Sequence, residues 1–123
     1  MKKYIVLIIG LIILLVLFKY DRPLTMEDVV GTYINTGYKS KVCCVEAPHV
    51  PDTLVLRADS TFHSGFWGEG NYIIKTGTPT TIKLEYDYEY GKAGYSTYFG
   101  SALLEKQHIV INYDLSHRFV KIK

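Results

Sequence analysis

The residues with the clearest capacity for chemistry lie close together near the middle of the chain. Cys43, Cys44, Glu46 and His49 offer thiolate, carboxylate and imidazole groups, all of which can bind zinc or copper. Adjacent cysteines on an extended strand point to opposite faces, however, and prolines on both sides of His49 predict an irregular loop. We therefore expect an ordinary surface loop here and predict no metal site.

The two adjacent cysteines leave three alternatives open. Cys43 and Cys44 can form a strained disulfide with each other, form a disulfide to another chain, or stay as thiols on opposite faces of a strand. An oxidising compartment would favour one of the two disulfides, because free thiols are unusual there. The choice therefore depends on where the domain resides.

The histidines and serines lack the spacing of a catalytic centre. His63, His108 and His117 are scattered, and none has a carboxylate placed to orient it as a base. The serines lack the G-x-S-x-G turn of hydrolases, and no glycine-rich loop precedes a helix. We predict that the protein is not an enzyme, with no catalytic residues and no cofactor.

A row of carboxylates follows one predicted strand. Glu85, Asp87 and Glu89 alternate along it, so that they share one face at spacings of about 7 Å. Such a row can attract a cation or a basic partner, but it is more typical of a solvated face that discourages edge pairing between strands. We interpret it as a solubility feature.

Aromatic residues point more directly to binding. Nine of the eleven tyrosines follow residue 30, and several of them cluster around one predicted hairpin. Tyr86, Tyr88 and Tyr90 alternate along a strand and would line the interior or the mouth of a barrel, where Trp67 can cap the same cavity. We predict these four residues as ligand-binding residues.

The amino terminus contains an apolar run of helical length. Tyr4 to Tyr20 would form a helix of about 25 Å, compared with roughly 30 Å for the hydrocarbon core of a bilayer. The terminal tyrosine rings and the flanking lysines suit the headgroup regions. We expect a single uncleaved transmembrane helix that contacts the membrane. A cleaved signal peptide and a buried helix are the alternatives, although no small-residue cleavage site follows Phe18.

This anchor would also set the location of the rest of the chain. Lysines at positions 2 and 3 favour a cytoplasmic amino terminus, which predicts a single-pass protein of the cytoplasmic (inner) membrane with an extracytoplasmic, periplasmic domain. Residues 1–22 hold four of the 14 Lys and Arg and one of the 12 Asp and Glu, so ten basic and eleven acidic residues remain beyond them. That balance argues against a basic surface that binds phosphate groups, and we predict no nucleic-acid partner.

The sequence divides into an anchor with its flanks, residues 1–22, and one domain, residues 23–123. Thr25, with Asp28 three positions later, predicts a short capped helical turn. Beyond it, two-residue alternation and regularly spaced turn residues predict an all-β fold, an antiparallel meander of eight to nine strands that closes into a small barrel. The predicted strands are 31–37, 41–47, 53–58, 61–67, 71–75, 81–90, 96–104, 106–113 and 117–122, and the turns between them include 68–70 and 91–94. Alternation places Phe66, Ile82, Leu84 and Tyr113 among the residues that face the interior.

Several short motifs follow the order found in one known group of domains. An early Gly-x-Tyr, a hairpin that ends in Asp-Ser-Thr-Phe, a second Gly-x-Tyr and a closing strand resemble the bacterial lipocalin-like (calycin-type) barrels, and they lie at 31–33, 53–62, 70–74 and 119–122. Ser60 stands where that group usually has glycine, although Asp59 and Ser60 can form a turn assisted by the side chain. The resemblance implies a barrel, but it does not specify an activity.

Two functions are compatible with these observations. We expect a membrane-anchored, non-catalytic binding module for a small apolar ligand or a lipid, held among the tyrosines. The alternative is a protein-interaction factor, either immunity- or inhibitor-like or a subunit of an envelope complex, that uses the carboxylate row and exposed tyrosines. A central cavity would favour the first function, and a filled core with an external aromatic patch would favour the second.

Overall fold

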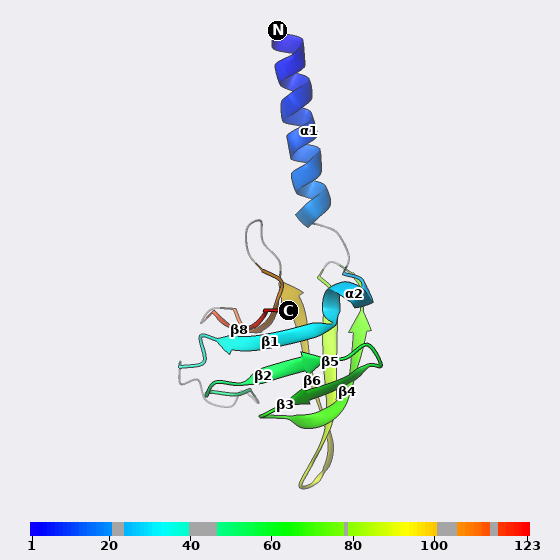
Figure 1. Cartoon of the computed structure of the whole chain (residues 1–123), viewed down its shortest axis with the longest axis vertical. Coiled ribbons are helices and arrows are strands. Elements are labelled where there is room, and N and C mark those ends of the chain that lie inside the picture. The colour runs from blue at the N-terminus through cyan, green and yellow to red at the C-terminus, as the bar shows by residue number, and fades with distance from the viewer. Residues whose placement is uncertain (21–23, 40–46, 78, 101–105, 114–115) are drawn as a thin grey trace.

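Eight antiparallel strands form one closed barrel in which each strand pairs with its neighbours in sequence and β8 returns to β1 (Figure 1). The computed structural model describes residues 1–20, 24–39, 47–77, 79–100, 106–113 and 116–123, without the side chains of 18–20. The elements are α1 (Lys2–Tyr20), α2 (Met26–Val29), β1 (Gly31–Thr36), β2 (Thr53–Leu56), β3 (Thr61–Ser64), β4 (Gly68–Lys75), β5 (Thr81–Tyr88), β6 (Gly91–Gly100), β7 (His108–Asn112) and β8 (His117–Lys121). The predicted antiparallel barrel is confirmed.

The prediction of a transmembrane helix is wrong. In the described part of the chain, no helix is long and apolar enough to cross a membrane. The physical reason is the short distance between charges in α1: residues 4–18 lie between Lys3 and Lys19 and span only about 22 Å, against roughly 30 Å of hydrocarbon. The fold class is therefore a barrel without the predicted membrane span.

The interior of the barrel is filled by side chains that alternate with exposed ones. In β5, Ile82 and Leu84 are buried, whereas Lys83 between them and Glu85 after them face solvent. Small eight-stranded barrels have an interior that side chains can occupy completely. The buried apolar cluster comes from α2 and all eight strands of the barrel, with two further residues from connecting segments: Val29, Tyr33, Ala47, Leu54, Leu56, Phe62, Trp67, Tyr72, Ile82, Leu84, Phe99, Ile109 and Phe119.

The short helix α2 lies beside β1 and adds to this core (Figure 1). Its predicted cap is present: the Thr25 backbone N–H donates to Asp28 Oδ2 at 2.9 Å, and the Asp28 N–H donates to Thr25 Oγ1 at 3.4 Å. Tyr33, which is fully buried, donates its hydroxyl to the Val29 carbonyl at 2.6 Å and accepts from Gln107 Nε2 at 3.0 Å. Burial raises the pKa of the Tyr33 hydroxyl well above its usual value.

The turn between β2 and β3 is stabilised by the side chain that precedes Ser60. Ser60 has a φ of 68°, in the left-handed region that favours glycine. Asp59 Oδ1 accepts hydrogen bonds from the Thr61 N–H at 3.1 Å and from its hydroxyl at 2.5 Å. These bonds, which lower the pKa of the exposed Asp59 carboxyl, provide the side-chain assistance that the sequence predicted.

Some predicted strand positions are wrong at the hairpin ends. Residues 68–70 and 91–94, which were expected as turns, belong to β4 and β6. Phe66 and Tyr113 were expected inside the barrel but are 48% and 79% exposed, because β3 ends at Ser64 and an irregularity in β7 shifts the alternation. The predicted strand 41–47 and the end of strand 96–104 fall largely outside the described residues.

Two phenylalanines four positions apart test how much the filled interior contributes. Phe62 is fully buried and Phe66 is half exposed. We expect Phe62→Ala to lower the free energy of unfolding by about 3–5 kcal/mol, because it removes core contacts and leaves a cavity. Phe66→Ala should cost less than about 1 kcal/mol. Urea unfolding followed by circular dichroism measures both, and equal losses would contradict the burial assignment.

Candidate functional site

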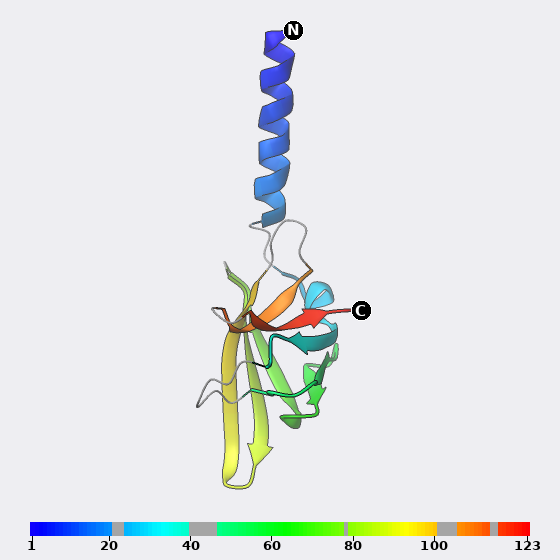
Figure 2. The same cartoon turned by 90° about the vertical axis from the view of Figure 1, so that its left-hand side faces the viewer.

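The meander brings the β3–β4 turn and the β5–β6 hairpin to the same end of the barrel, opposite α2. β5 pairs with β4 only as far as Tyr86, opposite Gly70, but its pairing with β6 continues to Tyr88, opposite Gly91. The tip of this hairpin therefore extends beyond the rest of the barrel (Figure 2). This is the physical reason that Tyr88 and Tyr90 are 50% and 82% exposed although they continue the inward face of β5.

An aromatic pocket of about 240 Å³ lies between the turn and the hairpin. We define the aromatic pocket by the residues that line it: Phe66, Trp67, Tyr86, Asp87, Tyr88 and Ala93. Three of the four predicted ligand-binding residues, Trp67, Tyr86 and Tyr88, therefore come together. The fourth, Tyr90, does not line the pocket, but its ring packs against that of Tyr88 at 6.0 Å and 67°.

Trp67 closes the end of the core and forms one wall of the aromatic pocket. Its side chain is 5% exposed, and its ring lies 5.4 Å from that of Tyr95 and 5.8 Å from that of Phe119. The Phe66 ring meets it edge-on at 5.3 Å and 88°. Such ring pairs stabilise the folded state by more than the burial of their apolar surface alone. The indole Nε1 is buried and has no hydrogen-bond partner among the described residues.

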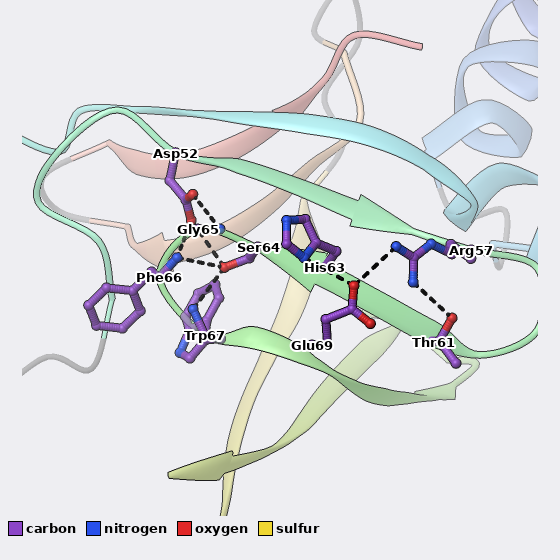
Figure 3. Close-up of polar contacts among 9 residues, drawn as sticks. All are labelled: Asp52, Arg57, Thr61, His63, Ser64, Gly65, Phe66, Trp67 and Glu69. Atoms are coloured by element: carbon purple, nitrogen blue, oxygen red, sulfur yellow. Dashed lines mark hydrogen bonds and ion pairs between the residues drawn. The ribbon is translucent and has the colours of Figure 1, made fainter. Parts of the chain in front are cut away.

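A carboxylate holds the turn that presents Phe66 and Trp67 (Figure 3). Asp52 accepts hydrogen bonds from the Gly65 N–H at 2.8 Å, the Ser64 hydroxyl at 3.2 Å and the Phe66 N–H at 3.4 Å. The Ser64 hydroxyl oxygen in turn accepts from the Trp67 N–H at 2.9 Å. The backbone of the turn is therefore fixed by side chains, which positions the two rings before any ligand arrives.

Asn35 on β1 fixes the position of Asp52. Its Oδ1 accepts from the Asp52 backbone N–H at 2.7 Å, and its Nδ2 donates to the Val50 carbonyl at 2.7 Å. Asn35 is 6% exposed, so these bonds satisfy a buried amide. Neither Asn35 nor Asp52 was predicted as a site residue, because their role depends on contacts between strands that sequence spacing does not show.

Ser64, His63 and Asp52 do not form a catalytic relay despite their residue types. Ser64 is buried toward the core, whereas His63 faces outward, where its Nδ1 lies 3.3 Å from a Glu69 carboxylate oxygen (Figure 3). Arg57 lies 3.6 Å from the same carboxylate oxygen. All three side chains are at least 44% exposed, so these contacts contribute little to stability.

Beside the aromatic pocket, a polar groove of about 350 Å³ follows strands β4 to β6. We define the polar groove by its lining residues: Gly70, Asn71, Lys83, Glu85, Tyr86, Asp87, Lys92, Ala93 and Gly94. The first carboxylate of the predicted row, Glu85, is paired within the groove, because Lys83 Nζ lies 3.5 Å from a Glu85 oxygen. Tyr86, Asp87 and Ala93 line both the groove and the aromatic pocket, so the two sites adjoin.

The residues first considered for metal binding are only partly described. Cys43, Cys44 and Glu46 lie outside the described residues, so their disulfide and thiol alternatives stay predictions. His49 is exposed, and its ring lies 5.6 Å from the buried ring of His117. Within the described ranges, no group of three or more His, Cys, Asp or Glu side chains could hold a metal ion.

No family model matches the chain, and neither curated proteins nor solved structures give a significant match.

Removing the Asp52 carboxylate tests whether it positions Trp67. We expect Asp52→Ala to lower the free energy of unfolding by about 1–3 kcal/mol, because the partly buried Ser64 hydroxyl and two backbone N–H groups lose their acceptor. The emission of Trp67, the only tryptophan of the chain, should shift to longer wavelength as its ring becomes hydrated. Glu89→Ala, which changes an exposed carboxylate at the hairpin tip, is the control. An unchanged emission in Asp52→Ala would contradict this role.

His117 should make stability depend on pH. Burial, and to a smaller extent the neighbouring His49, lowers the pKa of His117 below 6.5 in the folded state. The unfolded chain therefore binds a proton before the folded chain does, and stability should fall as the pH drops from 6.5 toward the lower folded pKa. His117→Gln should reduce this fall in urea unfolding measured at pH 7.5 and 5.5, whereas His63→Gln, at an exposed position, should not. Equal pH dependence in all three proteins would contradict the assignment.

Proposed function

We propose that the barrel is a non-catalytic binding module and that its aromatic pocket holds a small apolar ligand, or the apolar end of a larger one. One observation carries the proposal: Phe66, Trp67, Tyr86 and Tyr88 come from two separate hairpins and converge on one pocket. Ligand sites are typically concave and lined mainly by apolar and aromatic side chains, with few polar groups. The aromatic pocket has this composition.

The size of the pocket limits the ligand. Its volume of about 240 Å³ is somewhat below the range of about 300–1,000 Å³ that is typical of pockets for drug-sized molecules. A single ring, a branched aliphatic group or the end of an acyl chain fits this volume. The filled interior of the barrel directs such a ligand to the end of the barrel instead of its centre.

The resemblance to bacterial lipocalin-like domains supports the same proposal. An eight-stranded antiparallel meander that closes on itself is the architecture that those motifs imply. We propose that the domain is lipocalin-like in this sense, with its binding site moved to the hairpin end because the interior is occupied. The location of the domain outside the cytoplasm stays a prediction, and binding in the aromatic pocket does not depend on it.

A protein-interaction role is the second candidate, and the hairpin tip favours it. Tyr88, Tyr90 and Phe66 expose 50%, 82% and 48% of their surfaces at one end of the barrel. Tyrosine and phenylalanine are enriched at interfaces between proteins. The two candidates differ in the residue they require, because Tyr90 lies outside the aromatic pocket but is the most exposed ring of the tip.

Cyclohexanol, a neutral ring that does not absorb where tryptophan is excited, tests binding in the aromatic pocket. We expect a saturable change in Trp67 emission during its titration, because Trp67 forms a wall of the pocket. Tyr88→Ser should weaken binding about fivefold or more, since it removes an apolar wall. Tyr90→Ser should leave the affinity unchanged.

Two results would count against the proposed function. The absence of a saturable change up to the solubility of cyclohexanol would contradict binding in the aromatic pocket. Equal weakening by the Tyr88 and Tyr90 substitutions would move the site to the hairpin tip and favour the protein-interaction role.

A further inference from the structure

The aromatic pocket combines rings with a single charged residue. Four of its six lining residues are aromatic, and Asp87 is the only charged one among the described residues that line it. An aromatic ring carries partial negative charge on its face and attracts a cation positioned over it. Several rings around one cation form the aromatic cage that recognises substituted ammonium groups.

We infer that the aromatic pocket is selective for a small organic cation with a substituted ammonium group. This inference rests on the proposed function and specifies the ligand class for the same site. A fully methylated, quaternary ammonium presents methyl groups to the walls and spreads its charge over them, and it has no N–H group that would need a hydrogen-bond acceptor. The rings of Trp67, Tyr86 and Tyr88 supply both the apolar contact and the attraction to positive charge.

Asp87 adds to the selectivity from the rim of the pocket. The residue is exposed and lies between Tyr86 and Tyr88 on β5, so strand alternation directs its side chain to the opposite face of the hairpin from the two rings. Its charge therefore acts on a bound cation from the edge of the open pocket and not by direct contact beside the rings. Its cross-strand partner is Lys92, which lines the polar groove but not the aromatic pocket, and no ion pair joins these two described residues. The net effect of the charges lining the pocket therefore favours a cation, although salt weakens an attraction at an exposed site.

The opposite charge is disfavoured by the same geometry. An anion over these rings would meet their negative faces and would be repelled by the nearby charge of Asp87. A neutral ligand of the same shape would keep the apolar contact but lose the attraction to the rings. Selectivity between matched cationic and neutral ligands is therefore the property that separates a cation site from a general apolar pocket.

Choline and 3,3-dimethylbutan-1-ol provide this matched pair, because they share size and shape and differ by the replacement of the ammonium nitrogen with carbon. We expect choline to bind the full-length protein about fivefold more tightly than the neutral alcohol at low salt, measured by Trp67 emission. Asp87→Asn should weaken choline binding about twofold and leave the alcohol unaffected. Tyr88→Leu should remove most of the preference for choline, because it keeps apolar volume and removes a ring. Tyr113→Leu, an exposed tyrosine outside the pocket, should change neither affinity.

The outcomes separate this inference from the function on which it rests. If the alcohol binds as tightly as choline, the cation selectivity is overturned and binding of apolar ligands in the pocket stands. If neither ligand nor cyclohexanol produces a saturable change, both proposals are overturned. A preference for choline that survives Tyr88→Leu and Asp87→Asn together would also overturn the inference, since the cation would then bind elsewhere.

A third ligand identifies the source of the ammonium group. Phosphocholine carries the same ammonium with an added phosphate, which would lie toward the polar groove and Lys92 if it is accepted. Tighter binding of phosphocholine than of choline, lost in Lys92→Gln, would support a lipid headgroup as the source. Tighter binding of choline than of phosphocholine would support a free cation as the ligand. If neither choline nor phosphocholine binds to the unaltered protein, the inference is overturned.

Discussion

Closing eight short strands into a barrel leaves a narrow interior, and filling that interior constrains every other part of this structure. Alternation along each strand sends one set of side chains inward, and these side chains are large enough to pack into a single cluster. Val29 from α2 and Trp67 from the β3–β4 turn belong to the same cluster and lie toward opposite ends. Because the centre is occupied, concave surface for a ligand is displaced to the end where the β5–β6 hairpin extends past its neighbours.

The fold could be predicted from the sequence wherever two-residue alternation coincides with burial. Ile82 and Leu84 were placed inward and are buried, and the Thr25 cap was recognised from residue type and spacing alone. The predicted burial is wrong where the two-residue alternation continues past the last paired residues of the barrel. Tyr88 still follows the inward pattern of β5, but the pairing of β5 with β4 has already ended at Tyr86, opposite Gly70. Only the pairing of the strands shows where the barrel ends. The prediction of a membrane span is wrong for a different reason. The segment between Lys3 and Lys19 is apolar, but as a helix it is shorter than the hydrocarbon core of a bilayer.

The sequence predicted most of the aromatic residues of the candidate site but not the polar residues that hold them in position. Trp67, Tyr86 and Tyr88 stood out by type, and the structure brings them to one pocket. Phe66 was assigned to the interior because it follows the alternation of β3 past Ser64, where that strand ends. Asp52 and Asn35 could not be found from spacing, because the hydrogen bonds that make them important join residues 12 to 17 positions apart across strands. Predicting such support requires the register of the sheet, which the sequence specifies only through packing.

Binding in the aromatic pocket is the central claim, and the single tryptophan allows a direct measurement of it. In an amide correlation spectrum of isotope-labelled protein, the indole Nε1–H of Trp67 gives one resolved signal, which can be followed as cyclohexanol is added. We expect a saturable shift of this signal together with the amides of Tyr86, Tyr88 and Ala93. Shifts confined to the outer faces of β1 and β2, or no shift at any concentration that cyclohexanol reaches in water, would contradict it.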